Sequence, residues 1–126
     1  MGKRRKKEPR IECVAYLSVP GDLRNVERLE KNQERYIREY AAAHNIEIVA
    51  VVHRHGFGQS AVNQQFATIT ELIRKKKVGG IIVANMMAIS ADIPDAYYKV
   101  GKIHAAGGVI ITVDEGRLLL GIKEEV

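Results

Sequence analysis

The sequence predicts an open α/β domain over residues 11–126, with a mostly parallel sheet of four to five strands and helices on both faces. Four short apolar segments have the composition of buried strands. The three segments between them repeat their apolar residues with helical spacing. Strands that alternate with helices pair in parallel through right-handed crossovers. Because no repeat or linker divides the 126 residues, we expect one domain.

The strands are expected where apolar and β-branched residues run together. IECVAYL (11–17) is the first, and IEIVAVVH (46–53) is the second. GIIVA (80–84) and VIITV (109–113) follow as the third and fourth. RLLLGI (117–122) could add a short fifth strand near the end of the sequence.

The first helix is expected over residues 25–44. Asp22 or Asn25 can cap its start, and Asn45 can take the left-handed position that ends it. Glutamates placed four residues before a base support this helix on its polar face. Its expected buried stripe consists of Val26, Leu29, Gln33, Tyr36, Ile37, Tyr40 and Ala41.

Two further helices complete the pattern. The helix over 61–77 places Val62, Phe66, Ile69 and Ile73 on one face. It ends in RKKK (74–77), where cations favour the negative end of the helix dipole, before Gly79 and Gly80. Residues 85–92 form a loop, and Asp92 with Pro94 starts the last helix, which Gly107 and Gly108 stop. Its expected apolar stripe is Ile93, Tyr97, Val100 and Ile103.

The basic character of the chain is concentrated in its first ten residues. The net charge is +5, from 20 Lys and Arg against 15 Asp and Glu. Removing the six bases and one acid of residues 1–10 leaves 14 of each sign. Such a segment cannot bury itself, so we expect a disordered tail that contacts nucleic acid or only solubilises the chain. The DNA-contacting residues would be Lys3, Arg4, Arg5, Lys6, Lys7 and Arg10.

Other features favour a cytoplasmic protein without a membrane span. The longest apolar runs are short and interrupted by glycine, and the charged N-terminus lacks the apolar region of a signal peptide. The lone Cys13 lies in an apolar strand, where it is expected to be a small buried residue.

In such folds ligands bind at the carboxyl ends of the strands. The loop over 54–60 contains G-x-G-x-x-A between a strand and a helix, but the acid that would hold a ribose is missing about twenty residues later. His53 and His55 could begin a metal site, without a visible third ligand. Ser18, His55 and Asp114 have no spacing that marks a catalytic triad. We therefore expect no cofactor and no metal.

The order of motifs over residues 11–115 resembles the catalytic domain of serine recombinases, the resolvases and invertases. That family opens with Tyr-x-Arg-x-Ser, and AYLSVPGD keeps Tyr16. The segment LEKNQERYIREYAAAHNIEIV resembles the family's first helix. HRHGFGQS is similar to its mobile glycine loop, NQQF to the start of its second helix, and NMMAISA to its third loop. The resemblance implies a resolvase-like fold.

The resemblance also implies that the catalytic residues are missing. The family's nucleophilic serine aligns with Pro20, and its neighbouring arginine aligns with Ser18. The arginine of the second helix aligns with Asn63, and the Asp-Arg and final Arg of the third loop align with Met87, Ala88 and Ala91, leaving Ser90 as a structural serine. Phosphoryl transfer needs a nucleophile and cations. Ser18 is no substitute, because no arginine is expected to converge on it.

The expected function is therefore binding without catalysis. One hypothesis is a DNA-associated accessory or regulatory protein of a mobile element that docks on DNA or on an active recombinase. A second is a protein interaction or oligomerisation module without nucleic acid, and a third is a phosphate- or nucleotide-binding protein that uses the loop over 54–60. The consecutive leucines of RLLLGI cannot all face a core in a strand, which favours a homodimer.

Overall fold

The structure is a computed structural model that describes residues 10–19, 23–54 and 58–117. Within these ranges, no helix has both the length and the apolar character needed to cross a membrane. The elements in chain order are β1 (Ile11–Leu17), α1 (Leu23–Ala43), β2 (Ile46–His53), α2 (Gln59–Arg74), β3 (Gly80–Val83), α3 (Met86–Ile89), α4 (Ile93–Ala105), β4 (Val109–Thr112) and β5 (Gly116–Arg117).

The five strands form one sheet in the order β2-β1-β3-β4-β5, and the first four are parallel. The short β5 pairs with β4 in antiparallel fashion. This arrangement confirms the predicted open, mostly parallel sheet. The part of the predicted fifth strand beyond Arg117 lies outside the described residues.

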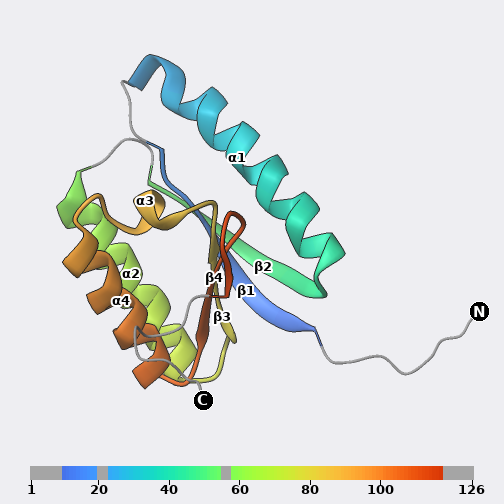
Figure 1. Cartoon of the computed structure of the whole chain (residues 1–126), viewed down its shortest axis with the longest axis vertical. Helices are drawn as coiled ribbons and strands as arrows, with labels where there is room; N and C mark the ends of the chain where they lie inside the picture. The colour runs from blue at the N-terminus through green and yellow to red at the C-terminus, as the bar shows by residue number, and fades with distance from the viewer. Residues whose placement is uncertain (1–9, 20–22, 55–57, 118–126) are drawn as a thin grey trace, which may run out of the picture.

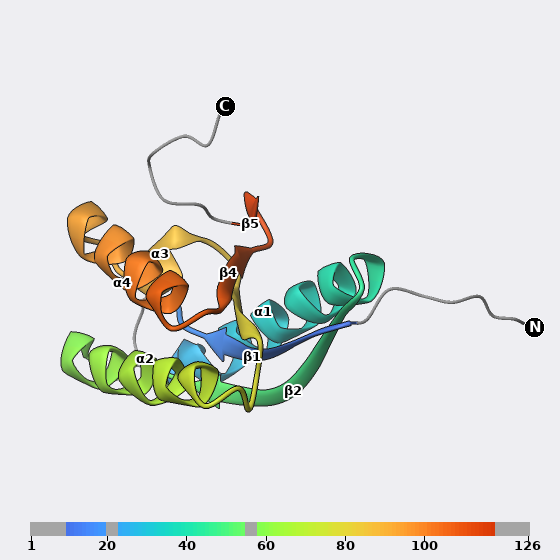
Figure 2. The same cartoon turned by 90° about the horizontal axis from the view of Figure 1, so that it is seen from below.

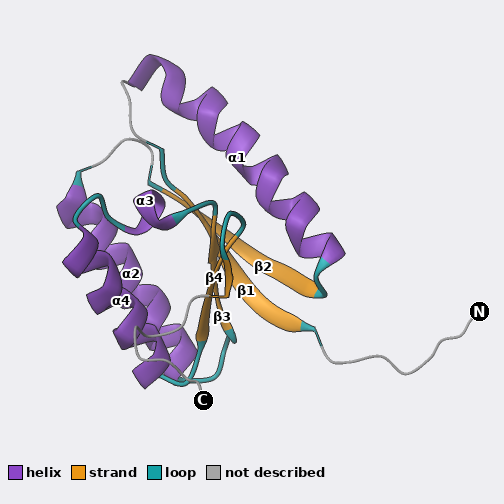
Figure 3. Ribbon diagram, in the orientation of Figure 1, coloured by secondary structure: helices purple, strands orange, loops and turns teal. Residues whose placement is uncertain are grey.

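Helices cover both faces of the sheet, as predicted (Figures 1 and 3). Helix α1 packs on one face, whereas α2 and α4 lie side by side on the other (Figure 2). Alternate residues of β1 serve the two layers: Cys13, Ala15 and Leu17 face α1, while Val14 and Tyr16 face α2 and α4. All five are buried, including Cys13. The central strand is therefore a shared part of two hydrophobic cores.

Two predicted stripes were wrong in part. Tyr36 of α1 is 46% exposed, and Ile93 and Tyr97 of α4 are also exposed. The buried positions in their place include two charged residues, Glu30 and Lys99. Glu30 contacts Nδ1 of His53 and the ammonium of Lys99 pairs with Asp95, so neither side chain is buried without a polar partner. The stripe predicted for α2 is confirmed.

The ends of the helices follow local chemistry. Asn45 has the predicted left-handed backbone, with φ of 61°. Asp92 caps α4 by accepting a hydrogen bond from the backbone N–H of Asp95. Asn25 is not a cap, because α1 begins at Leu23, and the alternative cap Asp22 lies outside the described residues.

Two predicted boundaries also change. The segment over 85–92, predicted as a loop, contains the single turn of α3, which Asn85 caps by accepting from the N–H of Ala88. Helix α2 ends at Arg74 rather than within the lysines that follow it.

The second glycine after α2 allows β3 to approach β4. A Cβ atom at Gly80 would lie 2.3 Å from the carbonyl oxygen of Val109, whereas one at Gly79 would have its nearest neighbours at 3.4 Å. Gly79 and Gly80 were predicted to end the helix. Gly80 instead allows the backbones of β3 and β4 to come close together, because no side chain fits between it and Val109.

We expect Gly80→Ala to lower the free energy of unfolding by about 1–3 kcal/mol, because the methyl group overpacks the β3–β4 contact. Gly79→Ala is the matched control and should change stability much less. Urea denaturation of both variants measures the difference, and equal midpoints would contradict the close approach.

Candidate functional site

A cluster of polar side chains lies at the carboxyl ends of β1 and β2. We call it the strand-end cluster; it comprises Tyr16, Ser18, Glu30, Gln33, His53, Arg54 and Gln65. Its members come from β1, α1, β2, α2 and the residues that follow the two strands. This edge is where parallel α/β folds place their ligands.

Ser18 is held in place at the end of β1. Its backbone N–H donates to Oε1 of Gln33 at 2.8 Å, and its carbonyl oxygen accepts from Nε2 of the same side chain at 3.1 Å. The side-chain amide of Gln33 therefore pairs with the backbone of Ser18 as the backbone of a neighbouring strand would. Only 3% of the Ser18 surface is exposed, and its partner Gln33 is half-buried.

The expectation that no arginine converges on Ser18 was wrong. Nη1 of Arg54 donates to Oγ of Ser18 at 3.2 Å. The backbone N–H of Arg54 also donates to the carbonyl of Leu17 at 2.9 Å, which extends the β1–β2 pairing and brings the guanidinium over the serine. Arg54 lies one residue beyond β2 and thirty-six residues from Ser18, so local sequence spacing did not reveal the contact.

Tyr16 connects the cluster to α2. Its hydroxyl donates to Oε1 of Gln65, and Nε2 of Gln65 donates to the carbonyl of His53 at 3.0 Å. The Tyr16 ring packs edge-on against Phe66, with ring centroids 5.1 Å apart. Burial raises the pKa of Tyr16 to about 12, and this outweighs the opposing influence of the Arg54 cation. At neutral pH Tyr16 is therefore a hydrogen-bond donor rather than a phenolate.

Glu30 and His53 form a second contact within the cluster. Oε1 of Glu30 lies 3.0 Å from Nδ1 of His53, and the Glu30 side chain is 1% exposed. This contact fastens the middle of α1 to the end of β2. His55, the second residue of the possible metal pair, lies outside the described residues. Within the ranges that the structure describes, no three His, Cys, Asp or Glu side chains gather as metal ligands.

Three solved structures of recombinases are similar to this chain. A resolvase family site-specific recombinase from Streptococcus pneumoniae matches with a TM-score of 0.70 and 18% identity over 85% of this chain and 74% of that one. The fold is that of a serine recombinase catalytic domain. The N-terminal catalytic domain of TP901-1 integrase matches with a TM-score of 0.67 and 16% identity, covering 83% and 79% of the two chains.

A third similar structure is the C-terminal catalytic domain of ISC1926 TnpA, an IS607-like serine recombinase. Its TM-score is 0.65, with 19% identity over 82% of this chain and 70% of that one. No protein-family model and no curated protein sequence matches the chain. The fold predicted from the order of motifs is thus confirmed by structural similarity.

Where they are described, the positions at which the resemblance places the recombinase arginines of the second helix and third loop carry no cation. Asn63 lies on the exposed side of α2, near its start, and its Oδ1 accepts from Gln59. Ala88 is buried in α3, and Ala91 is exposed beyond it. Ser90 is buried and its hydroxyl accepts from the N–H of Asp92, which suits the structural role expected of it. Pro20 lies outside the described residues.

The basic tail is described only at its last residue. Arg10 is exposed immediately before β1. The other predicted DNA-contacting residues, Lys3, Arg4, Arg5, Lys6 and Lys7, lie outside the described residues, and their role stays a prediction.

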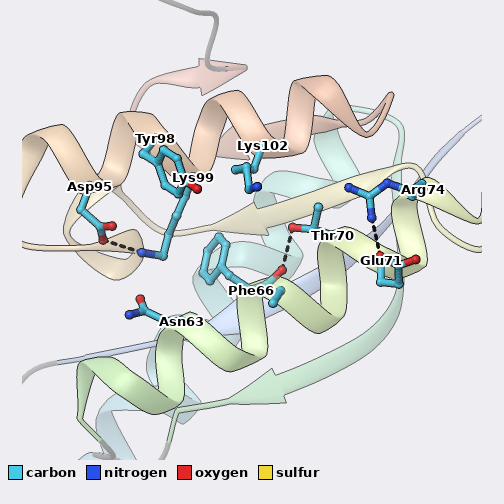
Figure 4. Close-up of a pocket in the computed structure, with 10 residues that line it drawn as sticks. Asn63, Phe66, Thr70, Glu71, Arg74, Asp95, Tyr98, Lys99 and Lys102 are labelled. Carbon is cyan, nitrogen blue, oxygen red and sulfur yellow. Dashed lines mark hydrogen bonds and ion pairs between the residues drawn. The ribbon is translucent and has the colours of Figure 1, made fainter.

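Sequence analysis missed a groove of about 380 Å³ between α2 and α4 (Figure 4). Lys99 lies across it, 7% exposed, and its ammonium pairs with Asp95 one turn earlier on α4. That hydrogen bond is the main reason why the pKa of Asp95 is lowered. Lys102 lies 5.5 Å from the Tyr98 ring centroid. The four-residue spacing of Asp95 and Lys99 was a usable signal, because such pairs meet on a helix.

We expect Gln33→Ala to destabilise the protein by about 2–4 kcal/mol, since it leaves the buried N–H and C=O of Ser18 without their partner. Asn32→Ala, at an exposed neighbouring position of α1, is the control and should be close to neutral. Chemical denaturation compares the two variants. A Gln33→Ala protein as stable as the control would show that the glutamine does not hold the strand end.

Stability should also fall at high pH through Tyr16. Its folded pKa of about 12 lies above the ordinary tyrosine value of 10.0, so the protonated hydroxyl contributes stability below pH 10 that is lost on going to pH 12. Tyr16→Phe should lose less of its unfolding free energy over this range than the unmodified protein. Tyr98→Phe, at a position 62% exposed, should behave like the unmodified protein. Identical pH profiles for all three proteins would contradict this assignment.

Proposed function

We propose that this chain is a recombinase-fold domain that does not cleave DNA and acts by binding. In this role it is a DNA-associated accessory or regulatory protein of a mobile element, docking on DNA or on an active recombinase. The observation that carries the proposal is the state of Ser18 and its surroundings. At the edge of the sheet where a recombinase fold would perform phosphoryl transfer, Ser18 is hydrogen-bonded to Gln33 and Arg54.

Ser18 is poorly placed to attack a phosphate. Its hydroxyl accepts a bond from Arg54, and its backbone is fixed on both sides by Gln33. A nucleophilic serine needs a base to take its proton and an open path to the phosphorus atom. The neighbouring carboxylate, Glu30, is engaged with His53. The buried serine is thus better suited to closing the strand end than to reacting.

The positions where the resemblance places arginines also lack cations. A phosphoryl-transfer site concentrates cations around the phosphate, and removing single stabilising groups commonly lowers rates by about 10²–10³. Asn63, Ala88 and Ala91 stand where the resemblance places arginines. Arg54 is one cation, and it already bonds Ser18. Together, the three positions without arginine support a much larger loss of reaction rate than one missing arginine would cause.

The proposed DNA contact is electrostatic and made by the basic tail. Its six bases have no interleaved aromatic residue that could stack on a base, so they would read phosphate alone. Homodimerisation through RLLLGI stays a prediction, because residues 118–122 lie outside the described residues. The alternatives are a protein interaction module and a nucleotide-binding protein. The glycine loop that would bind the nucleotide includes residues 55–57, which lie outside the described residues.

One experiment separates binding from cleavage. We expect the protein to retain supercoiled and linear DNA in native gels, and we expect sodium dodecyl sulfate to release all of it without a covalent adduct. Pro20→Ser should give the same result, because a restored hydroxyl would still lack the cations expected at 63, 88 and 91. An active serine recombinase with its own site is the positive control.

Two results would overturn parts of the proposal. A protein–DNA adduct that survives the detergent would contradict the inactive assignment. DNA that runs free in the native gel would contradict DNA association and leave the interaction module as the better description.

A further inference from the structure

The turn after α2 carries three exposed lysines on an unusual backbone. Lys76 has φ of 62°, in the left-handed region that glycine normally occupies after a helix. Its N–H donates to the carbonyl of Ile73, and the N–H of Lys77 donates to the carbonyl of Leu72, both at 2.9 Å. These two bonds satisfy the last carbonyls of α2 through the backbone. The lysine side chains are therefore not needed as hydrogen-bonding caps.

The left-handed backbone makes Lys76 a residue that stability alone does not favour. A side chain in this conformation is strained by roughly 1 kcal/mol relative to glycine. The charge of Lys75 and Lys77 on either side would already complement the helix dipole, an effect of only about 0.3–1 kcal/mol at exposed sites. Interaction with the helix dipole therefore accounts for Arg74 in the last turn of α2. It does not account for Lys75, Lys76 and Lys77 as well. Arg74 also pairs with Glu71 on its own helix.

These lysines share one edge of the sheet with the start of β1. Strand β1 pairs with β3 in parallel, with Cys13 opposite Gly80, so the segments that precede both strands leave the sheet at the same edge. The N–H of Gly79 donates to the carbonyl of Glu12 at 2.7 Å and holds the two segments together. Arg10 and Lys76 line a common groove of about 400 Å³, which also includes Glu12.

The elements that form this edge are separate in sequence and adjacent in space. Figure 1 shows the ends of α2 and α4 near the beginning of β3, at the end of the domain away from the carboxyl ends of the strands. We define the amino-edge basic surface as Arg10, Lys75, Lys76 and Lys77, all of which are exposed. In the sequence, five further bases precede Arg10 within residues 3–7.

We propose that the amino-edge basic surface binds the phosphate backbone of duplex DNA as a folded extension of the basic tail. This inference rests on the proposed DNA association and adds a fixed site to it, on the edge opposite the strand-end cluster. The hydrogen bonds of the turn fix the backbone of the lysines, so the three charges are held close together in one short segment. Contacts of this kind position DNA without reading its sequence.

The chemistry of the surface favours duplex DNA over other anionic partners. Stable attachment to a membrane surface generally adds apolar anchoring to the charge. Among the described residues, the exposed large apolar side chains lie on α1, β2, α3 and α4, and none is in the amino-edge basic surface. Single-stranded nucleic acid would be expected to use aromatic stacking, and this surface offers no aromatic side chain. A rigid line of phosphates is the ligand that bases alone can hold.

The test uses the full chain and a short labelled duplex of unrelated sequence over a salt series. In the edge variant, Lys75→Gln, Lys76→Gly and Lys77→Gln remove three charges. In the matched control, Arg28→Gln, Lys31→Gln and Arg35→Gln remove three exposed charges of α1. Each lost phosphate contact should flatten the slope of log affinity against log salt by about 0.9. We expect a slope flatter by roughly 2–3 and binding about 30-fold weaker near physiological salt in the edge variant, and little change in the control.

Lys76→Gly alone distinguishes binding from a structural role. Glycine relieves the left-handed backbone, so this variant should unfold at a higher temperature than the unmodified protein while its salt slope flattens by about 0.9. A variant that is both more stable and weaker in binding supports the proposal. A more stable variant with unchanged DNA affinity overturns it, because the lysine would then do nothing for the ligand.

Other outcomes separate this inference from the proposed function. If the unmodified protein binds DNA and the edge variant matches the control, the surface is not a DNA site, and DNA association through the tail stands. If neutralising Lys3, Arg4, Arg5, Lys6 and Lys7 to glutamine removes all binding at low salt, the folded surface also fails. Tighter binding of the unmodified protein to phosphatidylserine vesicles than to the duplex would likewise overturn the proposal in favour of a membrane surface.

Discussion

The rest of the structure depends on β1, which is buried on both faces at the centre of the sheet. Its side chains alternate between two layers, so Cys13, Ala15 and Leu17 pack under α1 while Val14 and Tyr16 pack under α2 and α4. A strand in this position excludes charged side chains and tolerates a polar group only with a partner. The Tyr16 hydroxyl meets this condition through Gln65, and that bond ties α2 to the central strand.

The same constraint extends to the residue that follows β1. Ser18 leaves the sheet while still buried, so its backbone groups need partners that no adjacent strand supplies there. Gln33 provides both, and Arg54 donates to the hydroxyl oxygen. In a catalytic α/β domain this edge keeps unsatisfied groups available for a ligand. Here Gln33 and Arg54 supply partners to Ser18, and these contacts tie α1 and the end of β2 to the end of β1.

Much of the fold followed from the sequence because the two cores are assembled from periodic apolar residues. The strands and the stripe of α2 needed only local spacing, and the order of motifs then indicated the family of folds. Glu30 escaped prediction because its partner, His53, is on another element and becomes a neighbour only when α1 packs on the sheet. The Arg54–Ser18 contact was missed for the same reason, since it depends on strand pairing rather than on spacing along the chain.

The distribution of charge gives the two edges of the sheet different capacities. At the carboxyl edge, among the residues that the structure describes, Arg54 donates to Ser18 and Glu30 contacts His53. At the amino edge, Lys75 and Lys77 point from a turn whose hydrogen bonds are complete without them, and their charge remains available to a partner. A backbone turn that would be more stable with glycine instead carries Lys76. Because an anion would contact the ammonium and not the backbone, the strain persists when it binds, and the lysine side chain would contribute binding free energy that glycine could not supply.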